Sequence, residues 1–246
     1  MRWRTLSITL GLFLLWQLGI WLFQTPSYIL PSPIAVLTSL YHNGNLLYHE
    51  AIPTLIETLM GLAIGILWGA IVAISMSLWR PVQSWTLPLI IGSQAIPTFA
   101  IAPILVIWLG YGIASKIATS VLILFFPVTA AFYDGLKHIK LSWLDLAQIN
   151  QANRYRTMLY IRLPAALPAL ATGIRMAAVW APIGAVMGEW VGSSRGLGFL
   201  ILESNARMNT QLMFAAIFVL IIISGFLYFL TDRILAKLVP WQTLKN

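Results

Sequence analysis

The chain of 246 residues contains no cysteine, only three histidines and few charges, with Asp, Glu, Lys and Arg together making up 9% of it. The missing cysteine excludes disulfide bonds and cysteine-ligated metals. The histidines lack the spacing of a metal site. There is no G-x-x-x-x-G-K-[ST] phosphate loop, so the chain does not bind ATP through that motif. These absences argue against a metal centre, a catalytic dyad and an enzyme.

Apolar residues dominate instead, at 59% of the chain. A helix needs roughly 20 apolar residues to cross about 30 Å of hydrocarbon. The sequence predicts an all-α, polytopic membrane protein with six transmembrane helices, at residues 5–23, 54–79, 87–109, 113–136, 164–190 and 212–235. We expect two parts. Residues 1–53 hold the first helix and an outer interfacial segment, in which Ser32-Pro33 starts a short helix, and residues 54–246 hold a five-helix core.

The formal net charge is +8, but the basic residues are scattered among loops and form no stripe, which argues against a nucleic-acid partner. Their distribution predicts membrane orientation. With the N-terminus in the cytoplasm, only Lys116, Arg195 and Arg207 fall outside. The inside set is Arg2, Arg4, Arg80, Lys137, Lys140, Arg154, Arg156, Arg162, Arg233, Lys237 and Lys245. Both termini and the loop 141–164 are therefore expected in the cytoplasm.

Residues 142–168 form the longest charged interruption between apolar runs. Ser142 and Asp145 have capping-box spacing, which predicts a short helix, and Asn153 is placed to cap a second one. Pro164 and Pro168 are expected to stop or bend the chain before the next span. A pair of short helices of this kind is either a solvated linker or a segment that another protein grips.

Two spans have marked internal patterns. In the second, Gly61, Gly65, Gly69 and Ala73 fall four residues apart, which predicts a ridge where another helix backbone approaches closely. In the third, Pro88, Pro97 and Pro103 interrupt the apolar run. The third span is therefore not expected to be a regular rod.

Polar and aromatic residues within the spans are candidates for a translocation pathway: Gln94, Thr98, Phe125, Tyr133, Arg175 and Glu189. We expect Gln94 and Thr98 to share one helix face. Arg175 lies near the middle of its span, where an unpaired cation costs at least about 2.5 kcal/mol. It therefore faces either a wet cavity or a protein partner. Glu189, near the outer end of the span, is expected to make a helix–helix hydrogen bond or to serve the pathway.

The loop resembles the "EAA" coupling loop of ABC-importer permeases, whose pattern is E-A-A, three residues, G, nine residues, I-x-L-P. Asp145, Leu146 and Ala147 stand at E-A-A, and Gln151 stands at the glycine. Ile161, Leu163 and Pro164 match I-x-L-P. Gly at the fourth conserved place allows a left-handed turn, so with Gln there we expect the turn to move to Asn150 or Asn153.

Similarity to one branch of this family, the nitrate/sulfonate/taurine permeases, extends along nearly the whole chain. The matching motifs are Leu30-Pro31-Ser32-Pro33, Ile96-Pro97, Ala102-Pro103, Trp108-Leu109-Gly110, Phe126-Pro127, Thr172-Gly173 with Arg175, Glu189, and Gly196-Leu197-Gly198. The same branch includes permeases for pyrimidine precursors of thiamine.

The resemblance implies a type I ABC-importer permease in a bacterial inner membrane, working as a homodimer. Two cytoplasmic ABC ATPase subunits would bind ATP and Mg and would each receive the coupling helix, Asp145 to Ala152. A periplasmic or lipid-anchored binding protein would deliver substrate at the outer loops, including Gly196 and Gly198. The substrate would be a pyrimidine precursor of thiamine or an anion such as a sulfonate, nitrate or taurine. The alternative from the residues alone is a proton-coupled secondary transporter that uses Glu189 or Arg175.

Overall fold

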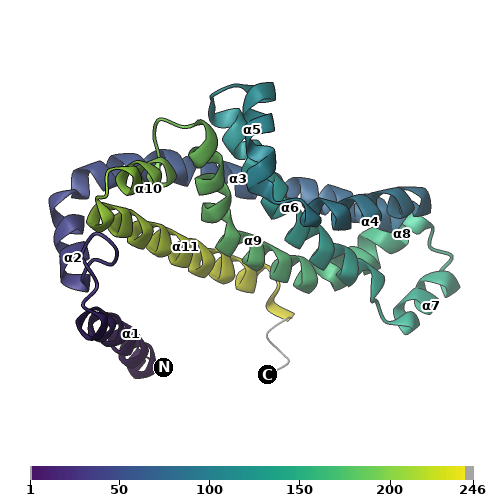
Figure 1. The fold of residues 1–246 in the computed structure, drawn as a ribbon. Helices are drawn as coiled ribbons and strands as arrows, with labels where there is room; N and C mark the ends of the chain where they lie inside the picture. Colours follow the sequence, from purple (N-terminus) through teal and green to yellow (C-terminus); the bar gives the residue numbers. More distant parts are fainter. Residues whose placement is uncertain (1, 242–246) are drawn as a thin grey trace.

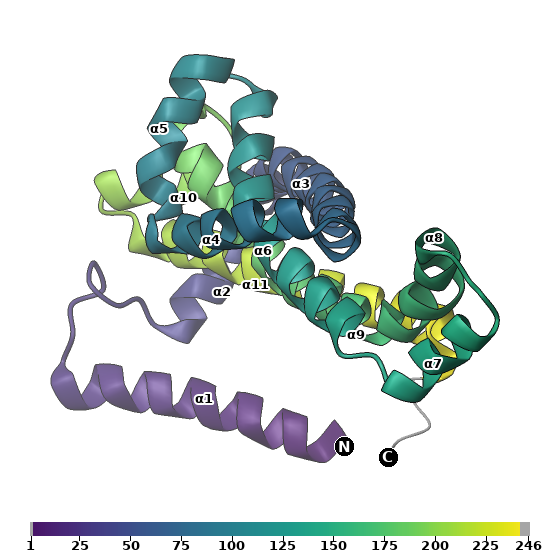
Figure 2. The same ribbon diagram turned by 90° about the vertical axis from the view of Figure 1, so that its right-hand side faces the viewer.

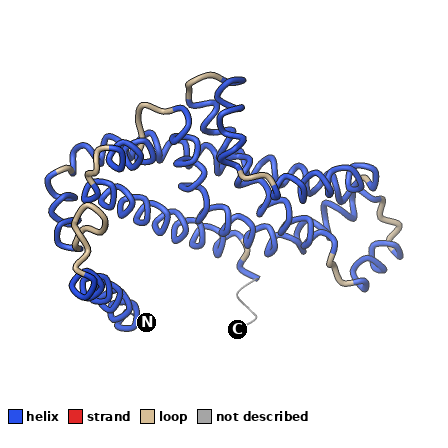
Figure 3. The backbone as a smooth tube through the Cα atoms, in the orientation of Figure 1, coloured by secondary structure: helices blue, strands red, loops and turns tan. Residues whose placement is uncertain are grey.

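The computed structural model describes residues 2–241, apart from the side chains of residues 2–6 and 9. Within this range all regular structure is helical, as the tube in Figure 3 shows. The helices are α1 (Arg2–Phe23), α2 (Pro33–His42), α3 (Gly44–Leu78), α4 (Arg80–Ala95), α5 (Thr98–Leu109), α6 (Ile113–Lys137), α7 (Leu141–Ile149), α8 (Arg154–Thr157), the π-helix η1 (Met158–Arg162), α9 (Leu163–Gly192), α10 (Leu197–Ala206) and α11 (Thr210–Leu238).

The long helices α3, α6, α9 and α11 run along the long axis of the molecule, with α7 and α8 at one end and α2 and α10 at the other (Figure 1). Among the described residues, four helices are long and apolar enough to cross a membrane: α3, α6, the continuous stretch Arg154–Gly192, and α11. The bent pair α4–α5 makes a fifth if it is counted as one span. The all-α polytopic fold is thus confirmed. Helix α1 lies at the edge of the molecule (Figure 2) and contacts the bundle through Trp16, whose ring centroid is 5.8 Å from that of Phe214 on α11.

Glycines bring α3 and α6 into close contact, as the four-residue spacing predicted. A Cβ atom added at Gly61 would lie 2.5 Å from the Cβ of Ser120, and one at Gly65 would lie 3.0 Å from the Cβ of Leu124. At Gly69 it would meet the backbone of α6, 2.9 Å from the carbonyl oxygen of Phe125. Only glycine leaves room for these approaches.

An adjoining face of α6 packs on glycines of α9 in the same way. A Cβ at Gly184 would lie 3.0 Å from the Cα of Ser120, and one at Gly188 would lie 2.8 Å from the Cα of Lys116. At Gly173 it would lie 2.8 Å from the carbonyl oxygen of Pro127. Helix α6 therefore packs closely on glycines of two helices that also touch each other, and the core of the bundle is this three-helix contact.

The second span begins earlier than its apolar run predicted. Helix α3 starts at Gly44 and continues through Pro53, so the start predicted at residue 54 is ten positions too late. Leu47 and Thr54, on either side of the proline, are both buried against the rest of the protein. This packing holds the helix together across the missing proline N–H. The N-cap predicted for α2 is confirmed, since the Ser32 hydroxyl accepts from the Ala35 amide at 3.2 Å.

The third span is broken, as its prolines predicted, but at one point only. Helices α4 and α5 meet at an angle of 105° around Ile96-Pro97, while Pro88 and Pro103 lie inside the helices. Gln94 and Thr98 therefore lie on two different helices, and the expectation that they share one face is wrong. The loop between the fifth and sixth predicted spans also contains a helix, α10, that the sequence pattern did not indicate.

We predict that Gly65→Leu destabilises the protein by about 1–3 kcal/mol, the cost of overpacking a close helix contact. The added side chain has no space against Leu124. Thermal unfolding of the purified protein in detergent measures the effect. Gly225→Leu is the matched control, because a Cβ there has nothing within 4 Å. Equal melting temperatures for the two variants would contradict the packing role of Gly65.

Candidate functional site

The coupling loop, residues 141–164, lies at one end of the molecule (Figure 1). Helix α7 begins after Lys140 without a side-chain cap, so the capping box predicted at Ser142 is wrong. Ser142 already lies in the first turn, and its hydroxyl is past the position that caps a helix. The cap predicted for the second short helix is confirmed, since Asn153 Oδ1 accepts from the Arg156 amide at 2.8 Å.

The turn between α7 and α8 is centred on Gln151, which has a φ of 51°. The Gln151 amide donates to the Gln148 carbonyl and the Ala152 amide donates to the Ala147 carbonyl, both at 2.9 Å. These two bonds make a Schellman motif. The expectation that glutamine moves the left-handed residue elsewhere is therefore wrong. The two bonds outweigh the backbone strain of about 1–2 kcal/mol that a residue with a Cβ carries there.

The side chains of α7 divide into an inner and an outer face. Ala147 is 4% exposed, whereas Leu146 is 56% and Ile149 is 79% exposed. Asp145 is also exposed, and Ala152 is partly buried. A cavity of about 230 Å³ lies beside the loop and is lined in part by Leu146, Ala147, Ala152 and Ile161. The loop thus presents isolated apolar side chains to its surroundings, while its alanine packs inward.

The chain does not stop or bend sharply at Pro164 and Pro168, contrary to expectation. Instead, the π-helix η1 leads directly into α9, and helix runs without interruption from Arg154 to Gly192. In an α-helix the Pro164 ring would clash with the carbonyl four residues earlier, and the wider π turn relieves this crowding. Ile161 and Leu163 are half-buried, and Leu163 packs on the apolar cluster around Phe132. The coupling loop is therefore joined rigidly to the span.

At the other end of α9, Glu189 is 1% exposed and makes the helix–helix hydrogen bond that was one of its two expected roles. Its Oε1 accepts from the Thr54 hydroxyl on α3 at 2.6 Å, and its Oε2 accepts from the Gly198 amide at 2.5 Å. A Cβ at Gly198 would lie 2.7 Å from this carboxylate. Glu189 thus ties α9 to α3 and to the start of α10.

The two backbone amides before Gly198 also find hydrogen-bond acceptors, and these are side chains of α3. The Gly196 amide donates to Glu50 Oε2 at 2.5 Å, and the Leu197 amide donates to the Thr54 hydroxyl oxygen at 2.8 Å. Gly196 has a φ of 113°, and a Cβ there would overlap the Glu189 carboxylate. Helix α10 is therefore capped by side chains of two other helices. We call the group Glu50, Thr54, Glu189 and the amides of 196–198 the outer clasp.

A buried ion pair that the sequence analysis missed lies close by. Lys116 Nζ donates to Glu57 Oε1 at 2.8 Å, with side-chain exposures of 11% and 2%. Lys116 was expected to be an outer-loop charge, yet it is inside the bundle. The signal that could have predicted this pair is Glu57, an acidic residue within an apolar span, which needs a buried basic partner.

Arg175 is paired as well, which decides between its two expected environments. Its Nε donates to Asp232 Oδ1 on α11 at 2.7 Å, so a neighbouring helix supplies the partner. Asp232 was also missed, although it is the only acidic residue in the last predicted span. Of the other pathway candidates, Phe125 is half-buried, and Tyr133 lines a cavity at the coupling-loop end. Gln94 is exposed and Thr98 half-buried.

Comparison with protein families gives one match, to the family described as "Binding-protein-dependent transport system inner membrane component", over residues 61–243. The chain belongs to this family. The permease is therefore the multi-pass inner-membrane component of an ABC importer, a complex that also contains an ATPase and a binding protein. Because ATP is hydrolysed in the partner chain, the permease is non-catalytic and needs no cofactor of its own. Family membership also decides against the proton-coupled secondary transporter.

Curated relatives cover almost the whole permease. It is 51% identical over 228 residues to a probable ABC transporter permease protein of Haemophilus influenzae, with 93% of each chain covered. It is 36% identical to the formylaminopyrimidine transport permease protein ThiX of Halalkalibacterium halodurans, covering 95% of this chain and 93% of that protein. It is 33% identical to the riboflavin transport system permease protein RibX of Chloroflexus aurantiacus, with coverages of 98% and 92%.

The fold also matches a solved ABC importer. A chain of the MetNI methionine ABC transporter, in inward-facing conformations, superposes with a TM-score of 0.60 at 18% identity. The superposition covers 78% of this chain and 93% of that one. At this identity the likeness shows the fold alone.

We predict that Gln151→Gly stabilises the coupling loop by about 1 kcal/mol, because glycine adopts the left-handed conformation without a Cβ clash. Hydrogen exchange of the Gln151 and Ala152 amides should slow by about fivefold. Gln148→Gly is the control, since residue 148 is helical and glycine there costs up to about 1 kcal/mol. Faster exchange in the Gln151 variant would contradict the strain at this turn.

We predict that Glu189→Ala destabilises the permease by about 1–3 kcal/mol, because it leaves the buried Gly198 amide without an acceptor and leaves the Thr54 hydroxyl only the Glu50 carbonyl, at 3.2 Å. Thermal unfolding gives the loss, and hydrogen exchange at residues 196–198 localises it. Glu203→Ala on α10 is the control: its pair with Arg207 is largely exposed and contributes less than about 1 kcal/mol. A clasp variant that unfolds no earlier than this control would exclude the capping role.

Proposed function

We propose that the permease works as a homodimer, with each copy seating its coupling loop on one cytoplasmic ATPase subunit. The observation that carries this proposal is the exposed apolar pair Leu146 and Ile149, three residues apart on one face of α7. Such side chains outside the bundle fit an apolar groove of a partner protein. The matching residues Asp145, Ala147, Gln151 and Ala152 shape the loop, and Ile161, Leu163 and Pro164 fasten it to α9.

The proposed orientation places the coupling loop and both termini in the cytoplasm, following the excess of basic residues at that end. Helix α1 supplies the sixth span, since its 22 residues are long enough to cross the hydrocarbon. Its peripheral place supports an outer part that contains α1 and a permease core that begins with α3 at Gly44, so the proposed boundary after residue 53 moves to the start of that helix. The family match begins at residue 61, which agrees with that division.

The unbroken helix from Arg154 to Gly192 supports a direct mechanical route through the membrane. One of its ends carries the coupling loop, and the other carries Glu189 of the outer clasp. Closure of the ATPase subunits would move the loop, and the helix would carry this motion to α10 and to Gly196 and Gly198 at the outer face. We propose that the binding protein docks at this face. Nucleotide binding inside the cell then biases access outside it.

We propose that the solute path runs between the two copies past Gln94, Thr98 and Phe125, with Tyr133 at its cytoplasmic mouth. Arg175 and Glu189 border this path, and their bonds to α11 and α3 fix its walls. Two cations in the middle parts of these helices are neutralised by carboxylates, Lys116 of α6 by Glu57 and Arg175 of α9 by Asp232. This pairing favours an uncharged solute over a sulfonate, nitrate or taurine.

The substrate we propose is therefore a flat nitrogen heterocycle of the pyrimidine type. The relatives named for formylaminopyrimidine and riboflavin support this class, because both of those solutes contain a planar heterocycle. The aromatic residues of the spans offer faces on which such a ring stacks.

The test is Ile149→Arg in the assembled importer. We expect uptake of a labelled aminopyrimidine to fall at least tenfold, and the ATPase subunit to be lost on purification, because a charge at the centre of an apolar contact is desolvated. Excess taurine should not compete with uptake by the wild type. The control is Leu238→Arg, an exposed apolar position outside the loop, at 63% against 79% for Ile149. Full uptake by Ile149→Arg would exclude the coupling contact, and strong competition by taurine would exclude the heterocycle.

A further inference from the structure

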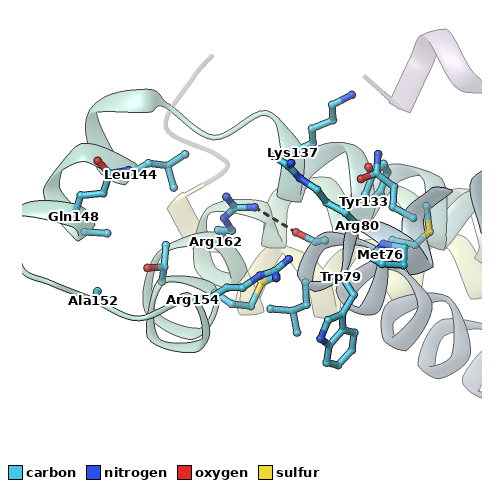
Figure 4. A pocket seen from close by; sticks show the side chains of 17 residues that line it. Met76, Trp79, Arg80, Tyr133, Lys137, Leu144, Gln148, Ala152, Arg154 and Arg162 are labelled. Atoms are coloured by element: carbon cyan, nitrogen blue, oxygen red, sulfur yellow. Dashed lines mark hydrogen bonds between the residues drawn. The ribbon is translucent and has the colours of Figure 1, made fainter.

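A cavity of about 750 Å³ opens between the coupling loop and the turn from α3 to α4. Figure 4 shows the side chains that line it. Four of them are cations that come from four different elements: Arg80 of α4, Lys137 of α6, Arg154 of α8 and Arg162 of η1. No Asp or Glu belongs to the lining.

These cations have no anionic partner among the residues that the structure describes. The polar contact seen for Arg162 is to a neutral group, with its Nη1 donating to Ser77 Oγ at 3.4 Å (Figure 4). The nearest acidic residue in sequence, Asp134, pairs with His138 at 2.9 Å and does not line the cavity. Charges of one sign gathered around one space repel each other, so a bound anion would stabilise this arrangement.

Other groups around the cavity also donate. Tyr133 and Gln83 belong to the lining and carry hydroxyl and amide donors. Helix α4 begins at Arg80 without a side-chain cap, so its positive end also faces the space. An anion with several oxygens around one centre fits this set of donors, since arginine binds phosphate through paired N–H groups. The donors thus suit a phosphate ester better than a lone carboxylate.

The cavity lies where the long helices end. Trp79, 45% exposed, and Trp85, 78% exposed, lie in the same region, and such aromatics are typical of the membrane–water boundary. Basic pockets between helices at the cytoplasmic boundary bind anionic lipid head groups. We propose that the cavity is a phosphate-ester site, filled by an anionic phospholipid head group or by a soluble phosphate ester, that ties Arg154 of the coupling loop to Arg80 of α4.

This inference depends on the proposed membrane orientation in one respect only, which is that a bound lipid would come from the cytoplasmic leaflet. Phosphate binding itself is measured on the purified permease without an ATPase. A failure of ATPase coupling in the Ile149→Arg experiment and a failure of phosphate binding are therefore separate results.

The experiment is native mass spectrometry and thermal unfolding of the permease in detergent with phosphatidylglycerol, phosphatidylcholine or glycerol 3-phosphate. The test variant combines Arg80→Gln with Arg154→Gln. The matched control combines Arg156→Gln with Lys237→Gln, which removes the same charge from residues outside the lining. A single Lys137→Gln variant, at an exposed last turn of α6, covers the case in which the double variant does not fold.

We expect phosphatidylglycerol to bind roughly 30-fold more weakly to the test variant, from about fivefold per cation, and unchanged to the control. For Lys137→Gln alone the expected loss is about fivefold. If glycerol 3-phosphate binds and stabilises as well as the lipid, a soluble phosphate ester is the ligand. The proposal is overturned if phosphatidylglycerol binds no more tightly than phosphatidylcholine and glycerol 3-phosphate does not bind, or if test and control variants weaken binding equally. It is also overturned if the test variant binds the phosphate ligands as the wild type does but binds an added ATPase subunit more weakly, since the cavity then docks protein.

Discussion

The close approach of three helix backbones is the constraint on which the rest of the structure depends. Lipid chains are as apolar as leucine, so burial alone does not hold helices together in a membrane, and packing has to do so. Helix α6 packs on glycines of α3 and on glycines of α9, and Ser120 touches both helices, at Gly61 and Gly184. A larger side chain in place of any of these glycines would push apart the helices that carry the coupling loop and the outer clasp.

Two groups of buried polar residues rely on that packing. The Glu57–Lys116 pair joins α3 to α6, and the clasp joins α3 to α9 and α10. A buried charge is costly unless its partner is held in place, so these contacts exist only where the backbones are fixed. In return, they define one register between the helices, which apolar contacts alone leave loose. The result is a bundle with polar connections at the end that carries α10 and exposed apolar side chains on the coupling loop at the other end.

Local patterns in the sequence predicted those features that neighbouring residues determine. The spacing of Gly61, Gly65 and Gly69 located a helix contact, and Asn153 located a cap. Features that depend on distant partners were missed. Lys116 lies 59 residues from Glu57, and Arg175 lies 57 residues from Asp232, so no local pattern connects them. The predictions for the start of α3 and for the turn at Gln151 failed for a related reason. Tertiary contacts overrode the local preference at Pro53, and a pair of hydrogen bonds overrode it at Gln151.

The π-helix between the coupling loop and the fifth span has a consequence for how one helix serves two tasks. A π turn holds about one residue more than an α turn, and one residue corresponds to about 100° of rotation around the helix axis. Met158–Arg162 therefore offsets the phase of the segment before it from that of α9. The side chains of α8, before the π-helix, therefore point in directions that differ from those that the periodicity of α9 would give them. Lipid packing and protein docking are thereby set independently along a single rod.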